Sequence, residues 1–189
     1  MKPSVPVVEF ADEYGNVCQR LIAPPGPFSI HTSADVMTSD TIDVISGYDQ
    51  VACISDWIHR TLHSNPVFEY DYMSAIEVNQ RREGVCCDFA HLGIASCRGL
   101  CIPACMVVGY LHGLQSINLH AWFEAYVNGR WYTFDATQSV PLGRRVTVAY
   151  GHDAANVAIF SQFGPALSPS VMQVSVELLE ITPEGSAFL

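Results

Sequence analysis

Residues 82–92, Arg-Glu-Gly-Val-Cys-Cys-Asp-Phe-Ala-His-Leu, decide how this 189-residue chain is interpreted. Gly84 predicts a turn, and a helix is expected from about Cys86 to Arg98, ending before Gly99. At a helix N-terminus, backbone N–H groups and the positive end of the helix dipole favour a thiolate over a thiol. The sequence therefore predicts an activated cysteine in the first turn of a helix.

Further along the chain, a predicted hairpin brings a histidine and an aspartate together. Asn128-Gly129 is a strong two-residue hairpin turn, with a strand expected on each side. His120 begins the first strand and Asp135 ends the second. In the register centred on the turn, Asp135 lies about two residues from the position opposite His120, within reach as a diagonal neighbour. Its carboxylate can accept a hydrogen bond from one imidazole nitrogen and leave the other nitrogen facing a thiol.

Nucleophilic cysteine catalysis needs a thiolate, a base that generates it and a group that orients the base. The three candidates for these roles are Cys86, His120 and Asp135, in that order. Cys87 is the competing nucleophile. Adjacent residues of a helix point about 100° apart, so Cys86 and Cys87 cannot both face His120 equally. The helix period alone does not decide between the two cysteines.

The composition argues against several classes of function. Hydrophobic residues make up 49% of the chain and charged residues 15%, which is typical of a folded domain. The formal net charge is −10, and the nine Lys and Arg residues form no stripe, which disfavours binding to nucleic acid or to an anionic membrane. The sequence contains no transmembrane-length apolar run and no signal-peptide h-region, so a cytoplasmic location is expected.

The seven cysteines are expected to be reduced thiols, because their number is odd and no signal peptide is recognised. Cys97, Cys101 and Cys105 repeat every four residues, but Gly99 and Pro103 interrupt a helix there, and paired C-x-x-C spacing is missing. A zinc site built from these cysteines is the weaker alternative. No segment has the spacing of a calcium-binding loop, so neither a metal nor another cofactor is expected.

The pattern along the chain predicts an α+β fold with two parts. Residues 1–45 are interpreted as a partial N-terminal β region and linker, and residues 46–189 as the catalytic domain. The remaining expected elements are strands over residues 7–10, 17–23 and 28–32, a linker over 33–48, a helix over 49–63, a second helix through 75–78 capped by Ser74, and strands over 106–110, 146–150 and 171–179.

Several motifs together resemble the bacterial transglutaminase-like superfamily, over about residues 52–163. They are Gly84-Val85-Cys86-x-Asp88-Phe89-Ala90-His91-Leu92, Ile102-Pro103-Ala104, Gly109-Tyr110, His120-Ala121-Trp122-Phe123-Glu124, Trp131-Tyr132-x-Phe134-Asp135-Ala136 and residues 151–157. Residues 7–32 are similar to the end of a β-rich region that often precedes this core. The resemblance implies a papain-like core, helices packed on an antiparallel sheet, with Cys86 rather than Cys87 as nucleophile, His120 as base and acid, and Asp135 as the orienting carboxylate.

The resemblance also implies acyl transfer on the amide bonds of a peptide or protein, through a thioester. Water as acceptor makes a peptidase or amidase, which we expect, whereas a lysine amine makes a protein-glutamine transglutaminase. A non-catalytic peptide-binding domain is the third interpretation. Two positions depart from the family pattern: Cys87 replaces a residue that is often Gln or Arg, and Cys105 replaces the Arg of Ile-Pro-Ala-Arg. Exposed edges of the N-terminal β segment suggest a homo-oligomer.

Overall fold

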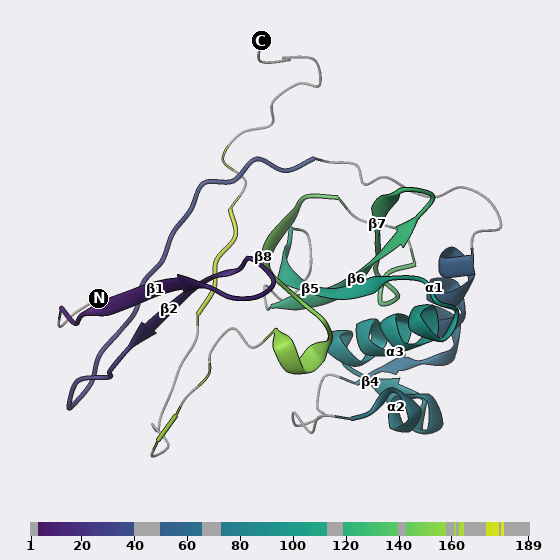
Figure 1. Ribbon diagram of the computed structural model, residues 1–189, viewed down its shortest axis with the longest axis horizontal. Coiled ribbons are helices and arrows are strands. Elements are labelled where there is room, and N and C mark those ends of the chain that lie inside the picture. Colours follow the sequence, from purple (N-terminus) through teal and green to yellow (C-terminus); the bar gives the residue numbers. More distant parts are fainter. Residues whose placement is uncertain are drawn as a thin grey trace, which may run out of the picture.

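The computed structural model describes residues 4–39, 50–65, 73–112, 119–139, 143–157, 161, 163–164, 173–177 and 179. Its centre is an antiparallel sheet of four strands in the order β7-β6-β5-β8, with helices packed on one side (Figure 1). The fold is therefore α+β, as the sequence predicts. The bounds of the sheet strands are β5 (Ala104–Leu111), β6 (His120–Val127), β7 (Arg130–Phe134) and β8 (Arg145–Gly151). The helices are α1 (Gln50–Thr61), α2 (Ala75–Arg81), α3 (Cys86–Gly99) and a 3-10 turn, η1 (Ala154–Asn156).

The register of the β6–β7 hairpin is the one that its turn predicts. Val127 pairs with Arg130 across the turn, and Phe123 pairs with Phe134 near the other end of the hairpin. Asn128 has φ 50° and Gly129 φ 91°, the left-handed backbone that a two-residue turn of this kind requires. β7 ends at Phe134, so Asp135 lies directly beyond the last strand residue.

The main core lies between α3 and one face of the sheet. Ala90, Ile94 and Cys97 of α3 belong to the same buried cluster as Phe123 and Ala125 of β6. Because side chains alternate along a strand, His120, Trp122 and Glu124 lie on the other face of β6. This alternation separates an apolar face under α3 from a face that carries the polar groups.

The helix predictions are confirmed, with two small corrections. α1 ends at Thr61, two residues short of the predicted range 49–63. Ser74 caps α2 in a capping box, accepting from Glu77 N–H at 3.3 Å while the Glu77 carboxylate accepts from Ser74 N–H at 2.8 Å. α3 includes Gly99, where the prediction ended the helix before that residue. The C-cap amide of Leu100 still bonds a carbonyl in the last turn, so this glycine does not interrupt the hydrogen bonding.

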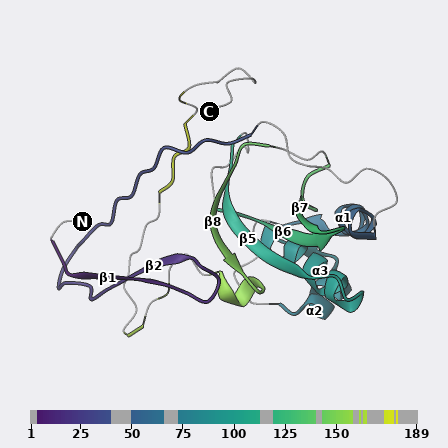
Figure 2. The same cartoon turned by 45° about the horizontal axis from the view of Figure 1, so that its top comes forward.

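The N-terminal segment forms a separate hairpin of β1 (Val7–Ala11) and β2 (Val17–Leu21). It projects from the β8 edge of the sheet, away from the helices (Figures 1 and 2). The Asn16 side chain joins the two parts by accepting from Tyr150 N–H at 2.8 Å and donating to Tyr150 O at 2.7 Å. The predicted boundary at residues 45/46 lies outside the described residues and stays a prediction.

Two strand predictions are wrong where the structure describes them. Residues 28–32 form no strand beyond a single bridge residue, because a strand needs a partner edge and the chain here runs extended and largely exposed. Residues 173–177 also lie in no strand, whereas 171–172 and 178 of that prediction lie outside the described residues. Among the helices of the described segments, none is both long enough and apolar enough to cross a membrane.

Candidate active site

Cys86 is the first residue of α3, and the turn before it is fixed from two sides. The Asp88 carboxylate accepts a hydrogen bond from Val85 N–H at 2.8 Å, which is half of a capping box at the helix start. A side chain at Gly84 would not fit, because its Cβ would lie 2.7 Å from Asp88 Cβ. The short parallel pair β3 (His63–Ser64) and β4 (Glu83–Gly84) ties this turn to the end of α1.

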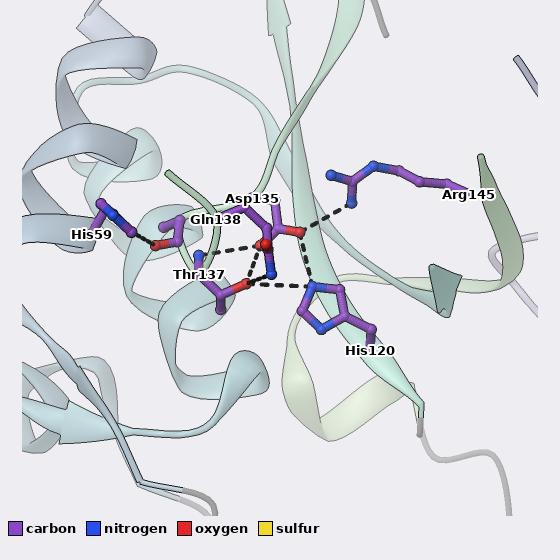
Figure 3. A network of polar contacts seen from close by, with 7 residues as sticks. His59, His120, Asp135, Thr137, Gln138 and Arg145 are labelled. Atoms are coloured by element: carbon purple, nitrogen blue, oxygen red, sulfur yellow. Dashed lines mark hydrogen bonds and ion pairs between the residues drawn. The ribbon is translucent and has the colours of Figure 1, made fainter. Parts of the chain in front are cut away.

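His120 and Asp135 meet on the polar face of the β6–β7 hairpin, as the sequence predicts. His120 Nε2 lies 2.8 Å from Asp135 Oδ2, and their side chains are 7% and 2% exposed (Figure 3). His120 and Cys86 also interact, because each shifts the pKa of the other, that of Cys86 downward and that of His120 upward. With Nε2 on the carboxylate, Nδ1 is the ring nitrogen left for the sulfur. The structure thus brings together all three residues that the sequence singled out.

Two partners of Asp135 were not predicted from the sequence. Its Oδ1 accepts from Thr137 Oγ1 at 2.6 Å and from Thr137 N–H at 3.2 Å, and its Oδ2 accepts from Arg145 Nη1 at 3.2 Å (Figure 3). The Thr137 contacts form an Asx-type turn, for which the spacing Asp-x-Thr is a recognisable signal. No comparable signal identifies Arg145, because it comes from β8, on the other side of β5.

The loop that carries Asp135 and Thr137 is anchored to a helix. His59 of α1 makes a hydrogen bond from Nδ1 to the carbonyl of Ala136 at 3.0 Å, and Gln138 Nε2 donates to Thr137 Oγ1 at 3.2 Å (Figure 3). These contacts hold the backbone that follows the carboxylate. The aspartate is therefore a fixed acceptor, which the orientation of an imidazole requires.

The electrostatics of the site favour a thiolate beside an imidazolium. A hydrogen bond from Cys87, followed by the contact with His120, lowers the pKa of Cys86 to about 5 against the opposing effect of burial. Burial alone would lower the pKa of His120, but hydrogen bonds to Asp135 and Cys86 outweigh it and raise this pKa to about 9. Between these two values, the proton resides on the imidazole and the sulfur is negative.

Cys87, the competing nucleophile, has the opposite character. Its hydrogen bond to Cys86 and its burial both raise the pKa of the Cys87 thiol, which stays protonated. Cys87 is thus a donor to the neighbouring thiolate, a role that the sequence pattern did not indicate. Hydrogen bonding to the charged form is one of the three physical causes that lower an acid's pKa.

The polar face of the sheet continues beyond the three predicted site residues. The guanidinium of Arg145 lies 4.9 Å from the centre of the Trp122 ring. Burial raises the pKa of Glu124, against the attraction of Arg145 and a hydrogen bond with Thr133. Cys105, the second departure from the family pattern, pairs with Glu124 across β5 and β6, and burial raises its pKa to about 11. In the described segments no three His, Cys, Asp or Glu residues are grouped so that they could hold a metal ion.

The sequence model of the transglutaminase-like superfamily matches residues 34–136. These residues contain Cys86, His120 and Asp135. The chain belongs to the transglutaminase-like superfamily. The match agrees with the resemblance that the sequence motifs indicate.

This transglutaminase-like chain is similar to several proteins of known structure or sequence. A candidate cysteine protease from Cytophaga hutchinsonii is 30% identical, with a TM-score of 0.70 over 86% of this chain and 72% of that chain. LapG of Legionella pneumophila is 15% identical, with a TM-score of 0.45 over 54% of this chain and 62% of that chain. An uncharacterized protein of Mycobacterium leprae is 27% identical over 140 residues, which cover 69% of this chain. The chain spans about half the length of that curated relative.

Proposed function

We propose that this protein is a cysteine-dependent hydrolase of amide bonds in peptides or proteins, with Cys86 as nucleophile, His120 as base and acid, and Asp135 as the orienting carboxylate. The observation that carries the proposal is the contact of Cys86 with a His120 whose other ring nitrogen is bound to a buried carboxylate. The 30% identity to a candidate cysteine protease supports the same class of chemistry.

The proposed reaction passes through a thioester. The Cys86 thiolate attacks the carbonyl carbon of the amide, and the negative charge moves to the carbonyl oxygen. The first N–H groups of a helix have no partner within the helix, so those at the start of α3 are placed to stabilise that oxyanion. When the C–N bond breaks, the His120 imidazolium donates its proton to the leaving amine. This step leaves an acyl group on sulfur and a neutral imidazole.

The second half of the proposed reaction returns the enzyme to its starting state. The neutral His120 takes a proton from water while the water oxygen attacks the thioester carbonyl. The C–S bond then breaks, releasing a carboxylic acid and restoring the thiolate–imidazolium pair. An amine acceptor in place of water would give transamidation by the same steps, so the acceptor alone separates a peptidase from a transglutaminase.

A peptide library analysed by mass spectrometry tests the proposal. Acid quenching of the wild-type reaction is expected to trap an acyl adduct on the peptide that contains Cys86, and the Cys86→Ala variant should give no adduct and no hydrolysis. A lysine-like amine added to the same reaction is expected to leave hydrolysis as the main outcome. Predominant amine incorporation would make the protein a transglutaminase. Full hydrolysis by Cys86→Ala, or peptide binding without any turnover, would contradict the proposed mechanism.

A further inference from the structure

Arg145 reaches the site from the far edge of the sheet. It is the first residue of β8, and β5 and β6 lie between this strand and β7, at whose end Asp135 is placed. Its Nη1 nevertheless lies 3.2 Å from Asp135 Oδ2, and the two side chains are 7% and 2% exposed. Figure 3 shows the guanidinium approaching the carboxylate from the side away from Thr137. The reaction proposed above assigns no role to Arg145.

The path of the Arg145 side chain is shaped by its neighbours. The guanidinium lies over the Trp122 ring, and that ring in turn lies against Gly109 of β5, where an added Cβ would be 2.9 Å from Trp122 Cη2. The same Cβ would be 2.0 Å from Val146 O, so β5 and β8 can approach each other here only because residue 109 is glycine. The Arg145 side chain therefore packs on the indole ring of Trp122, and this packing directs its guanidinium toward the Asp135 carboxylate.

The oxygen that Arg145 contacts is the one that orients the histidine. Asp135 Oδ2 accepts from both His120 Nε2 and Arg145 Nη1, whereas Oδ1 is held by Thr137. A buried ion pair carries a desolvation cost, and well-packed apolar side chains of similar volume would often be at least as stable. A role of Arg145 in the active site therefore explains a cation buried on this particular oxygen better than stability alone does.

We propose that Arg145 is a positioning residue of the triad, which keeps Asp135 ionised and aimed at Nε2 of His120. This inference rests on the proposed function of Cys86, His120 and Asp135. Its reasoning is electrostatic: an arginine beside an aspartate favours the carboxylate, the carboxylate favours the imidazolium, and the imidazolium favours the thiolate. Arg145 then acts on the sulfur through two intermediaries, without touching the substrate.

The ionisable groups around this relay come from each element packed on it. Arg145 faces Asp135 after β7 and Glu124 of β6, and His120 and Cys86 lie beyond Asp135. Arg144 lines the same pocket as Glu124 and Arg145, and Glu124 also interacts with Cys105 of β5 and Tyr150 of β8, whose pKa values burial raises. Neither of these thiol and phenol groups becomes charged in the acid range, so the acid range reports on the carboxylates, the histidine and Cys86.

The test compares Arg145→Gln with a matched arginine elsewhere in the sheet. Arg130 of β7 lies 4.9 Å from the centre of the Tyr132 ring, the same stacking as that of Arg145 on Trp122. The readout is the rate at which iodoacetamide labels Cys86 between pH 4 and 9, mapped by mass spectrometry. This readout needs no substrate. It therefore remains valid even if the wild-type protein hydrolyses no peptide in the assay of the proposed function.

For Arg145→Gln we expect the acid limb of Cys86 labelling to move to higher pH by about one unit, because a nearby arginine lowers a carboxyl pKa by about one to three units. Arg145→Lys keeps the positive charge, so its acid limb is expected to lie close to that of the wild type. Arg130→Gln should leave the limb where the wild type has it. A folded Arg145→Gln variant with the wild-type limb would overturn the proposal, as would an equal shift in Arg130→Gln.

A double-mutant cycle gives a second, independent decision. In the Asp135→Asn background, Arg145→Gln is expected to change the kcat/KM of hydrolysis by less than about twofold, because the carboxylate through which it acts has gone. Full additivity of the two losses would contradict a positioning role. If Arg145→Gln alone does not fold, the double variant is expected to fold as well as Asp135→Asn, and its failure to do so would also contradict the proposal.

Discussion

The β1–β2 hairpin and the β6–β7 hairpin are built from the same local elements and lie in different surroundings. Each has two antiparallel strands around a turn that contains a glycine with positive φ. Every residue of β1 is exposed, whereas Ala121, Phe123 and Ala125 of β6 are buried in the cluster that includes α3, and His120, on the other face of β6, is 6% exposed. The comparison shows that a hairpin acquires a fixed shape from what covers it, since a two-stranded sheet alone is marginally stable.

An aspartate in each hairpin makes the comparison specific. Asp12 of the first hairpin accepts from Tyr14 N–H and Asn16 N–H, both at 2.9 Å, much as Asp135 accepts from Thr137. Both carboxyl groups have a lowered pKa, Asp12 through Asn16, and Asp135 through His120 against the effect of burial. Only the aspartate of the covered hairpin is in contact with a histidine.

The largest expected effect comes from removing the charge of one aspartate. Asp135→Asn should lower kcat of peptide hydrolysis by about 10²- to 10⁴-fold, because the imidazole loses the anion that orients it and stabilises its protonated form. Asp12→Asn, the matched change in the exposed hairpin, should change kcat by less than about twofold. Steady-state kinetics of both purified variants measure this, and equal losses in the two would break the comparison.

Truncating an aromatic residue should lower the stability of the protein more in the β6–β7 hairpin than in the β1–β2 hairpin. Phe134→Ala removes a ring that is 8% exposed and stacked on Phe123 at 5.4 Å, and should lower the free energy of unfolding by about 3–5 kcal/mol. Phe10→Ala removes a ring that is 40% exposed, and should lower it by less than about 1 kcal/mol. Urea denaturation gives both values. A loss for Phe10→Ala as large as that for Phe134→Ala would show that the first hairpin is not loosely attached.

The sequence predicted those parts of the fold that depend on near neighbours. The helical spacing of α1 and α3, the Ser74 cap and the Val127–Arg130 register all follow from residues less than ten positions apart. The pairing of His120 with Asp135 was predictable because one hairpin positions both residues, whereas the choice of Cys86 over Cys87 came from the resemblance to the transglutaminase-like superfamily. Local rules of this kind depend on backbone geometry and turn chemistry, which the sequence shows directly.

The parts that the sequence did not predict depend on distant pairing. β8 lies beside β5 and not beside β7, its predecessor in the chain, so no spacing rule connects Arg145 with Asp135. The strand expected over residues 28–32 failed for the related reason that strand propensity does not supply a partner edge. The hydrogen bond of Cys87 to Cys86 depends on the rotamers of two half-buried thiols, which helix periodicity does not specify.

The smallest expected effect concerns that neighbouring thiol. Cys87→Ala removes the donor to the Cys86 thiolate, so the pKa of Cys86 should rise by about one unit. Because less thiolate is then present in acid, kcat/KM for hydrolysis should fall by about five- to tenfold at pH 5 and change little at pH 8. Cys105→Ala, a thiol beside Glu124, is the control and should leave the acid limb unchanged. An unshifted limb in Cys87→Ala would contradict the role given to Cys87.

The pH dependence of Cys86 alkylation in the wild-type protein tests the central claim most directly. Because the pKa of Cys86 is lowered to about 5, labelling by iodoacetamide should be half-maximal near that pH and remain fast through neutrality. Cys53, an exposed cysteine of α1, serves as the internal reference on the same molecule, and the half-buried Cys87 should label more slowly than Cys53. The account predicts that Cys86 is the first thiol labelled at pH 6. Labelling of Cys86 that rises only around pH 8.5, as for an ordinary thiol, would contradict it.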